Sequence, residues 1–492
     1  MFRLPWEKKP AFWTWLFVLL GIALRLFHYG RNPSMWHDEA ALVLNATGKT
    51  FTELLGPLFF AEAAPPLFSW IERGVFLLLG DGTYALRLVP FMANCLSLVL
   101  LAVAARRMLT PEAVPWVVLP FACADTILWH ACEAKPYSVD MLCATGLLTL
   151  YSYASSWKLI WQFAVYSVLA PVVVFISFPG CFLLGGLLVA LLPVVWQGLA
   201  KTKPCSTERQ SFTALLGYSL LVFMVLASFT LLLVGPIRAQ RCGPMTECWL
   251  DLFAPWDKPW KVPFWAILST IEVFHFACPP GGQPFAVLAL IGGIYLARRG
   301  QWRLLCLLII PPFLALLAAC ARAYPFGGAR VMAYAVPGLL ILIGAGTPLA
   351  LAWARARSRA VTLVLLGILF VPAVSAAQHA IVPWGRADCA GAADYVLAHR
   401  QATDFVTGNT WECQYYFRHL GDGFAPLERV RVPLHGRLWV IVSGIPTEDR
   451  IKLVLPLTVG QGRITEQHGF ERITLFLLEE AEPPITAEQA LP

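Results

Sequence analysis

Long apolar runs separated by short polar segments dominate this chain. About eleven of these runs approach the roughly 20 apolar residues that a helix needs to cross a bilayer. Because a helix satisfies its own backbone hydrogen bonds, the pattern predicts a polytopic α-helical membrane protein. The predicted spans are residues 12–29, 85–105, 111–129, 137–154, 160–178, 180–199, 212–235, 284–298, 304–321, 331–351 and 360–378.

A shorter apolar stretch, Leu67 to Leu79, carries Glu72 and Arg73 at its middle. We predict that it lies on the membrane as an interfacial helix. With the N-terminus inside, the eleven spans then place five basic clusters on the cytoplasmic side, as the positive-inside rule requires. Counting 67–79 as a further span would move the first cluster outside and reverse every later one. The clusters are Arg106-Arg107; Trp157-Lys158; Lys201, Lys203 and Arg209; Arg298, Arg299 and Arg303; and Arg355, Arg357 and Arg359.

The same count predicts which segments lie on the outer face. These are loop 30–66, the segment from His130 to Pro136, loop 236–283, the segment from Arg322 to Arg330, and everything after about residue 379. We interpret the basic start of the chain and its first apolar run as an uncleaved signal anchor, because no small-residue cleavage pattern follows. The predicted organisation is a transmembrane domain over 1–378, an extracytoplasmic domain over 379–478 and a disordered tail over 479–492.

The C-terminal region changes character. Residues 388–400 have the pattern of an amphipathic helix, and 410–420 also favour a helix. Short runs at 404–407, 437–443 and 470–478 are typical of strands. This alternation predicts a small soluble α/β domain.

Composition agrees with a membrane protein and excludes a nucleic-acid partner. Hydrophobic residues make up 58% of the chain, charged residues only 14%, and the mean hydropathy is +0.65. The net charge of +7 does not indicate nucleic-acid binding, because the basic residues form short clusters between apolar runs. No CxxC metal motif occurs. Cys242 with Cys248, or Cys389 with Cys413, could form a disulfide if these regions face an oxidising compartment.

Two adjacent carboxylates, Asp38 and Glu39, follow the first span in the sequence His37-Asp38-Glu39-Ala40. Paired acids at a membrane exit indicate a site that handles a proton or a cation. We predict no cofactor; the alternative is a divalent metal held by His37, His275 and Asp38. The chain has no Walker loop, no GxGxxG and no Asp-x-Asp pair, so a nucleotide-sugar donor is not expected.

Four ordered stretches resemble the membrane glycosyltransferases of the GT-C superfamily. They are similar to the branch with protein O-mannosyltransferases, lipid A aminoarabinose transferase and bacterial lipid-core sugar transferases. The chain departs from that pattern at Ala64, where relatives often have His, at Lys135, where they often have Arg, and at Val331, where an aromatic is common. The stretches are Trp36 to Ala40; Ala64 to Leu67 with Tyr84 to Pro90; Cys132 to Tyr137; and Tyr324 through Arg330 to Pro337.

This resemblance implies a polyprenyl-phosphate sugar donor, a lipid, glycan or protein acceptor, and inversion at the anomeric carbon. Asp38 is the candidate base, because the attacking acceptor must lose a proton. Cations that contact the leaving phosphate stabilise the transition state. By resemblance to bacterial members, we expect the inner membrane, with the C-terminal domain outside. The remaining candidates are Glu39, His37, Glu133 and Tyr137 for orienting the acceptor, and Lys135, Arg330, Arg322 and Arg87 for the donor phosphate.

Two alternatives compete with this function. A flippase or transporter of a lipid-linked glycan would carry paired acids near the membrane midplane within broken helices, often in inverted repeats. The predicted position of the acids outside the spans, and the lack of a visible repeat, disfavour it. A catalytically inactive, lipid-binding scaffold is the other alternative, and the presence of Asp38 argues against it.

Overall fold

A computed structural model describes residues 8–200, 207–432 and 436–479. The described residues form two compact units. The first contains residues up to 31 and 46–382, and the second contains 32–45 and residues from 383 onward. Segment 32–45, which was expected within an outer loop of the transmembrane domain, therefore groups with the C-terminal unit. The first residues of the predicted signal anchor, the basic residues Lys201 and Lys203, and the predicted tail beyond Glu479 lie outside the described residues.

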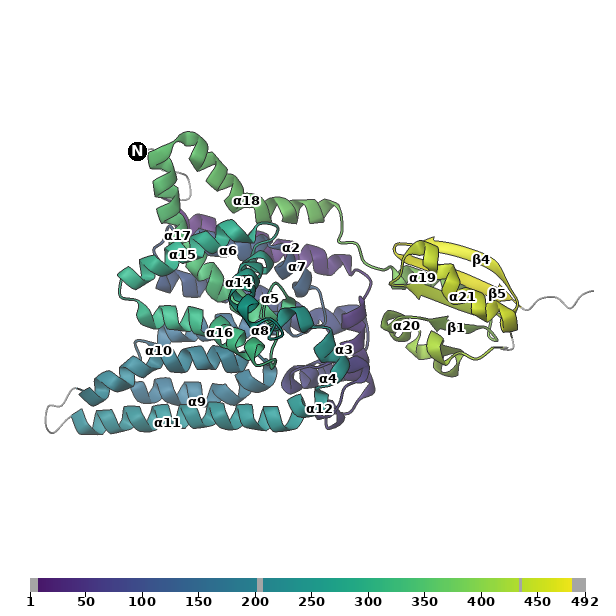
Figure 1. Cartoon of the computed structure of the whole chain (residues 1–492), viewed down its shortest axis with the longest axis horizontal. Coiled ribbons are helices and arrows are strands. Elements are labelled where there is room, and N and C mark those ends of the chain that lie inside the picture. Colours follow the sequence, from purple (N-terminus) through teal and green to yellow (C-terminus); the bar gives the residue numbers. More distant parts are fainter. Residues whose placement is uncertain (1–7, 201–206, 433–435, 480–492) are drawn as a thin grey trace, which may run out of the picture. The chain divides into compact units, whose positions relative to one another are not determined.

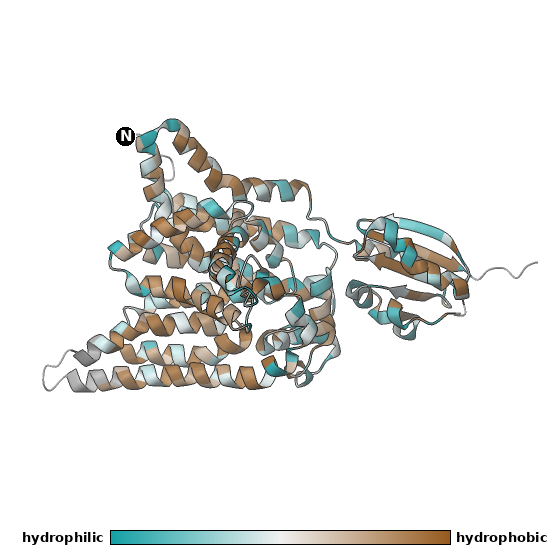
Figure 2. Cartoon of the chain, in the orientation of Figure 1, coloured by the Kyte–Doolittle hydropathy of each residue, from teal (hydrophilic) through white to brown (hydrophobic). Residues whose placement is uncertain are grey.

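The first unit is a helical bundle whose helices are mostly apolar (Figures 1 and 2). Each of the eleven predicted spans coincides with a helix or a pair of helices. Within this bundle α9, α10 and α11 lie side by side, and α10 also packs against α16. The helices of the predicted spans, together with α14, are α2 (Pro10–Arg31), α5 (Thr83–Met108), α6 (Val114–Cys123), α7 (Asp125–Ala131), α8 (Tyr137–Ala154), α9 (Leu159–Ile176), α10 (Gly180–Ala200), α11 (Thr207–Leu232), α14 (Val262–Ala277), α15 (Gly282–Arg298), α16 (Trp302–Cys320), α17 (Val336–Arg357) and α18 (Arg359–Ile381).

Seven helices of the described residues are long and apolar enough to cross a membrane, and nine spans result if each of two bent pairs counts as one. The bent pairs are α6 with α7, at 59°, and α14 with α15, at 100°. The chain is thus a multi-pass membrane protein, as predicted. Two of the eleven predicted spans fall outside the nine: α8, which carries Asp140, and α10, whose described apolar part is only Gly180–Trp196.

The segments between the spans contain more helix than predicted. Segment 236–283, predicted as an outer loop, includes the apolar helix α14. The stretch predicted at 67–79 is α4 (Pro66–Leu79), with Glu72 buried. The remaining short elements are η1 (Glu53–Leu55), η2 (Phe59–Ala61), η3 (Leu233–Ile237), α12 (Arg238–Gln240), α13 (Gly243–Glu247), η4 (Leu250–Leu252), η5 (Pro259–Lys261) and η6 (Arg330–Ala335).

A buried arginine holds the break between α6 and α7. The last carbonyls of a helix have no partner within that helix. Arg25 of α2 donates to two of them, the Phe121 carbonyl at 2.9 Å and the Ala122 carbonyl at 3.2 Å. A Cβ on Gly21 would lie 2.8 Å from the Ala122 side chain, so this glycine permits the close approach of α2 to α6.

The same guanidinium begins a chain of hydrogen bonds across the bundle. Arg25 Nε donates to Asn94 Oδ1 at 2.7 Å. Asn94 Nδ2 donates to Ser138 Oγ at 2.9 Å, and Ser138 Oγ donates to the His130 carbonyl at 2.7 Å. These contacts join α2, α5, α7 and α8 through polar groups that the surrounding apolar side chains remove from solvent.

The second unit contains a five-stranded mixed sheet with strand order β2-β1-β3-β5-β4. β1 pairs in parallel with β2 and β3, while β5 is antiparallel to both β3 and β4. The predicted α/β domain is confirmed, but β2, β4 and α21 were not predicted. The elements are α19 (Cys389–His399), β1 (Phe405–Gly408), α20 (Trp411–Tyr416), η7 (Arg418–Gly423), β2 (Phe424–Pro426), η8 (Leu427–Arg429), β3 (Leu438–Ser443), α21 (Thr447–Gln461), β4 (Arg463–Phe470) and β5 (Ile473–Glu479).

The central strands β3 and β5 are buried along their lengths, and the edge strand β4 is mostly polar (Figure 2). One face of the sheet packs against α19 and α20, and the other against α21. Cys389 and Cys413 are buried free thiols in the first of these cores. A hydrogen bond with the Cys413 thiol, together with burial, raises the pKa of Cys389 well above its usual range. Cys242 and Cys248 are also free thiols.

Asp404 fixes the start of β1 to β3. Its carboxylate accepts hydrogen bonds from Arg437 at 2.8 Å and from the Trp439 indole at 2.9 Å. Burial alone would raise the pKa of Asp404, but these bonds and one from the Gln401 backbone outweigh it and lower the pKa. A lowered pKa in the folded state stabilises the fold at pH values above the unfolded pKa of about 4. That contribution is lost as the pH falls through the folded value.

We expect Arg25→Met to lower the stability of the membrane unit by about 2–5 kcal/mol, because it leaves Asn94 and the α6 carbonyls without a donor. Thermal unfolding of the detergent-solubilised protein measures the effect. The control is Arg298→Met, at an exposed arginine near the end of α15, which should unfold within a degree or two of the parent. Equal unfolding temperatures for Arg25→Met and the parent would contradict the role of the network.

We expect Asp404→Asn to accelerate hydrogen–deuterium exchange in β1 and β3 at neutral pH, and the difference from the parent to shrink below about pH 4. Each comparison is made between parent and variant at one pH, so the intrinsic exchange rate cancels. Asp449→Asn is the control, because its ion pair with Lys452 is exposed to solvent. A difference from the parent that is the same at pH 7 and pH 3 would rule out the charge of Asp404 as the cause.

Candidate active site

The segment between α7 and α8 carries the predicted residues Glu133 and Lys135. Pro136, directly before α8, restricts the preceding residue to an extended or turn conformation. Glu133 is fully buried, and its carboxylate lies 2.6 Å from His130 Nδ1. The intramembrane hydrogen-bond chain that starts at Arg25 ends on the backbone of the same histidine. Glu133 is therefore connected to the interior of the bundle.

Lys135 forms an ion pair with Glu62, a residue of the loop between η2 and α4. Lys135 is 2% exposed and Glu62 17% exposed. A buried ammonium group needs such a partner, because an isolated charge in a low-dielectric interior is strongly unfavourable. The residues that precede Glu62, Phe60 and Ala61, both have positive φ values, of 65° and 52°. These values are uncommon for residues other than glycine.

Aromatic rings surround Arg330, the first residue of η6. Its guanidinium lies 5.5 Å from the Trp249 ring centroid and 5.9 Å from that of Tyr137. Tyr137 also contacts the ring of His130, at 4.9 Å between centroids. The structure therefore brings the predicted residues Glu133, Tyr137 and Arg330 into one cluster, through Tyr137 and His130.

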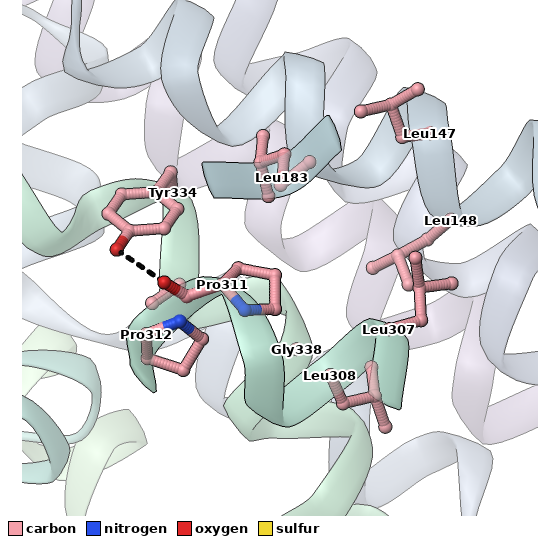
Figure 3. Close-up of a pocket in the computed structure, with 11 residues that line it drawn as sticks. Leu147, Leu148, Leu183, Leu307, Leu308, Pro311, Pro312, Tyr334 and Gly338 are labelled. Atoms are coloured by element: carbon pink, nitrogen blue, oxygen red, sulfur yellow. Dashed lines mark hydrogen bonds between the residues drawn. The ribbon is translucent and has the colours of Figure 1, made fainter. Parts of the chain in front are cut away.

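An apolar pocket begins one turn further along η6 (Figure 3). Tyr334 lines it, and the Tyr334 hydroxyl donates to the Pro311 carbonyl at 3.3 Å. A 3₁₀ helix rises about 2 Å per residue, so Arg330 and Tyr334 are about 8 Å apart along the axis. The element η6 thus presents a cation and an apolar pocket within a short distance. The other lining residues are Ala144, Leu147, Leu148, Leu183, Leu307, Leu308, Pro311, Pro312, Ala335 and Gly338.

The other two predicted phosphate-binding residues are placed differently. Arg322 is exposed just after α16, and its carbonyl accepts a hydrogen bond from Arg241 at 3.2 Å. Arg87 lies near the start of α5, with its side chain 1% exposed.

His37, Asp38 and Glu39 form the first turn of α3 (His37–Gly48) and belong to the second unit. Acids in the first turn interact favourably with the helix dipole. The two carboxylates have different surroundings: Asp38 is half-buried, whereas Glu39 is fully buried. Arg386 Nη1 lies 3.6 Å from Glu39 Oε2.

Nδ1 of His37 lies 3.1 Å from Glu412 Oε2, and its ring stacks on Trp411 at 3.8 Å. Within the described residues, no three His, Cys, Asp or Glu side chains are grouped in a way that could hold a metal ion.

No family model and no curated protein matches this chain. Some solved structures do match. The match to ArnT from Cupriavidus metallidurans in the apo state covers 95% of this chain and 98% of the ArnT chain, with a TM-score of 0.53 and 14% identity. The same protein bound to undecaprenyl phosphate matches 98% and 99%, with a TM-score of 0.52 and 14% identity.

The chain is similar in fold to ArnT, and the GT-C-like membrane fold predicted from the sequence is confirmed. The oligosaccharyltransferase of Archaeoglobus fulgidus, in a complex with Zn and sulfate, is less similar, with a TM-score of 0.49 and 11% identity. The match covers 84% of this chain and 62% of the length of that protein.

Several residues around the candidate groups were not predicted from the sequence. Glu62, His130 and Trp249 contact the cluster in the ArnT-like membrane unit, and Arg386 and Glu412 contact the α3 turn. Only His130 had a local signal, because it lies just three residues before Glu133 in the sequence. The others come from distant segments.

We expect Glu62→Gln to destabilise the membrane unit by about 3 kcal/mol, because it leaves the Lys135 ammonium buried without a carboxylate. The charge-swapped double variant Glu62→Lys/Lys135→Glu should recover most of the lost stability. Thermal unfolding in detergent measures both variants. The single charge reversals Glu62→Lys and Lys135→Glu complete the cycle. If the losses of stability of these two variants simply added up in the double variant, the ion pair would not be the stabilising interaction.

Proposed function

We propose that this protein is an inverting glycosyltransferase. It moves a sugar from a polyprenyl-phosphate carrier to an acceptor on the outer face of the bacterial inner membrane. The observation that carries the proposal is the ArnT fold, which extends over nearly the whole of both chains. One of those ArnT structures holds undecaprenyl phosphate.

The arrangement on η6 supports a donor with an anionic head and an apolar tail. Arg330 offers a guanidinium that can bind two phosphate oxygens at once. The residues around Tyr334 are mainly leucine and proline, and these side chains offer an apolar surface to the isoprenoid chain. Lys135 is the second candidate for the phosphate. Binding would require the phosphate to replace Glu62 as the partner of its ammonium group.

The proposed reaction is a single displacement at the anomeric carbon. The acceptor hydroxyl or amine gives its proton to the Asp38 carboxylate while its lone pair forms a bond to that carbon. The bond between the carbon and the phosphate oxygen breaks, and its electron pair leaves with the polyprenyl phosphate. Arg330 and Lys135 stabilise the negative charge that develops on the leaving group. Attack from the face opposite the phosphate inverts the configuration.

The two acids of the α3 turn are suited to different tasks. Asp38 keeps part of its side chain accessible, which a group that receives a proton from a substrate requires. Glu39 is buried beside Arg386 and is suited to holding the turn. Glu133, His37 and Tyr137 remain candidates for orienting the acceptor.

We expect Asp38→Asn to lower transfer by about 10²–10⁴-fold, because asparagine cannot accept the acceptor proton. The donor is the radiolabelled lipid-linked sugar that accumulates when the gene is deleted, and transfer is followed in membranes of the deletion strain that carry each variant. Asp257→Asn, at an exposed loop position, is the control and should transfer at the parent rate.

Parent-like transfer by Asp38→Asn would exclude Asp38 as the base. Parent membranes that move the labelled lipid between leaflets without transferring its sugar would instead support a flippase. Binding of the labelled lipid with neither transfer nor movement would support an inactive scaffold.

A further inference from the structure

The chain just before α3 is fixed to the C-terminal part of the second unit by backbone and side-chain hydrogen bonds. Ser34 Oγ donates to Asp388 Oδ1 at 2.8 Å. The backbone amide of Met35 donates to the Tyr416 hydroxyl at 2.9 Å. Arg386 Nη1 donates to the Ser34 carbonyl at 3.3 Å. This segment has no regular secondary structure, so its conformation depends on these contacts.

His37 is held in both position and orientation. Trp411 stacks on its ring with an angle of 13° between the planes. The Glu412 side chain, only 5% exposed, places its carboxylate 3.1 Å from Nδ1 of His37. The His37 side chain stays 41% exposed.

Glu39 is held on the other side of the turn. Its side chain is fully buried, and that of Arg386 is 4% exposed. Nη1 of Arg386 contacts both the Ser34 carbonyl and the Glu39 carboxylate. A single guanidinium joins the backbone before the turn to the side chain after Asp38.

The residues that make these contacts are on a rigid support. A Cβ on Gly408 would lie 2.5 Å from Cys413 Sγ, so α20 packs directly against β1. Asn409, between β1 and α20, donates to the Ser443 carbonyl at 2.8 Å and accepts from the Ser443 amide at 2.9 Å. Trp411 and Glu412 thus extend from a loop fixed to the central strand β3. Sites supported in this way hold their geometry better than sites on unsupported loops.

We propose that Arg386, Trp411 and Glu412 are positioning residues for Asp38. Successive side chains on an α-helix are separated by about 100°, so fixing residues 37 and 39 fixes the direction of residue 38 between them. The C-terminal unit thereby takes part in the reaction by setting where the base points. This inference rests on the proposed function and deepens it.

The proposal predicts losses in turnover with little change in donor binding. Arg386→Gln and Glu412→Gln should each lower kcat by about 10–10²-fold, because small displacements of a catalytic group have effects of that size. The KM for the labelled lipid-linked sugar should change by less than about threefold, since neither residue binds the donor. Arg386→Lys should recover part of the lost kcat, because lysine keeps the charge opposite Glu39.

The decisive test is a double-mutant cycle on Arg386→Gln and Glu39→Gln, with kcat and KM measured in full-length protein. If Arg386 acts through Glu39, the double variant should be no slower than the slower single variant. The matched control is Arg437→Gln, which breaks the Asp404 ion pair of the same unit away from the α3 turn. It should reduce the stability of the unit and leave kcat at the parent value.

Multiplicative effects of the two changes, or parent-like kcat in both Arg386→Gln and Glu412→Gln, would overturn the positioning role. An equal loss of kcat in Arg437→Gln would also overturn it, because general destabilisation would then explain the data. These outcomes are distinct from failure of the proposed function, in which the parent protein transfers no sugar and no variant can be slower.

Discussion

The arrangement of the helices in the membrane unit depends on hydrogen-bond partners for its buried polar groups. Arg25 lies deep among the helices, and its guanidinium supplies donors to carbonyls at the end of α6, where the span bends by 59°. Non-helical backbone at this depth persists only where protein groups replace water. The hydrogen bonds continue through Asn94 and Ser138 to the backbone carbonyl of His130, whose side chain contacts Glu133. The polar groups that stabilise the bend therefore end at a residue that also contacts the candidate site.

The candidate site of the membrane unit places a positive charge close to an apolar pocket. Arg330 lies between aromatic rings, and the apolar pocket begins at Tyr334, one turn away. Such a surface suits a molecule with a charged head and a long apolar tail. The proposed polyprenyl-phosphate donor is such a molecule.

The second unit is stabilised by different interactions from those of the membrane unit. Its sheet is held by buried apolar strands and by the Asp404 carboxylate, which joins Arg437 and Trp439. Away from that ion pair, α20 packs against β1, and its residues Trp411 and Glu412 contact His37 of the α3 turn. The sequence indicates only that the C-terminal region is a small soluble domain. In the structure, residues of this domain contact the turn that carries Asp38 and Glu39.

The sequence by itself determined most of the spans, because a membrane helix is a local property: about 20 apolar residues suffice, whatever surrounds them. It also located the acids at 38 and 39 and the cations at 135 and 330, since residue type limits chemistry. It missed α14, because charge parity had assigned that segment to an outer loop. It missed α21 and β4, because neither has a strong apolar period. Only the tertiary structure decided the partners: Glu62 for Lys135, Arg386 for Glu39 and Glu412 for His37. These pairs join segments far apart along the chain, and no local pattern records which distant side chain will neutralise a buried charge.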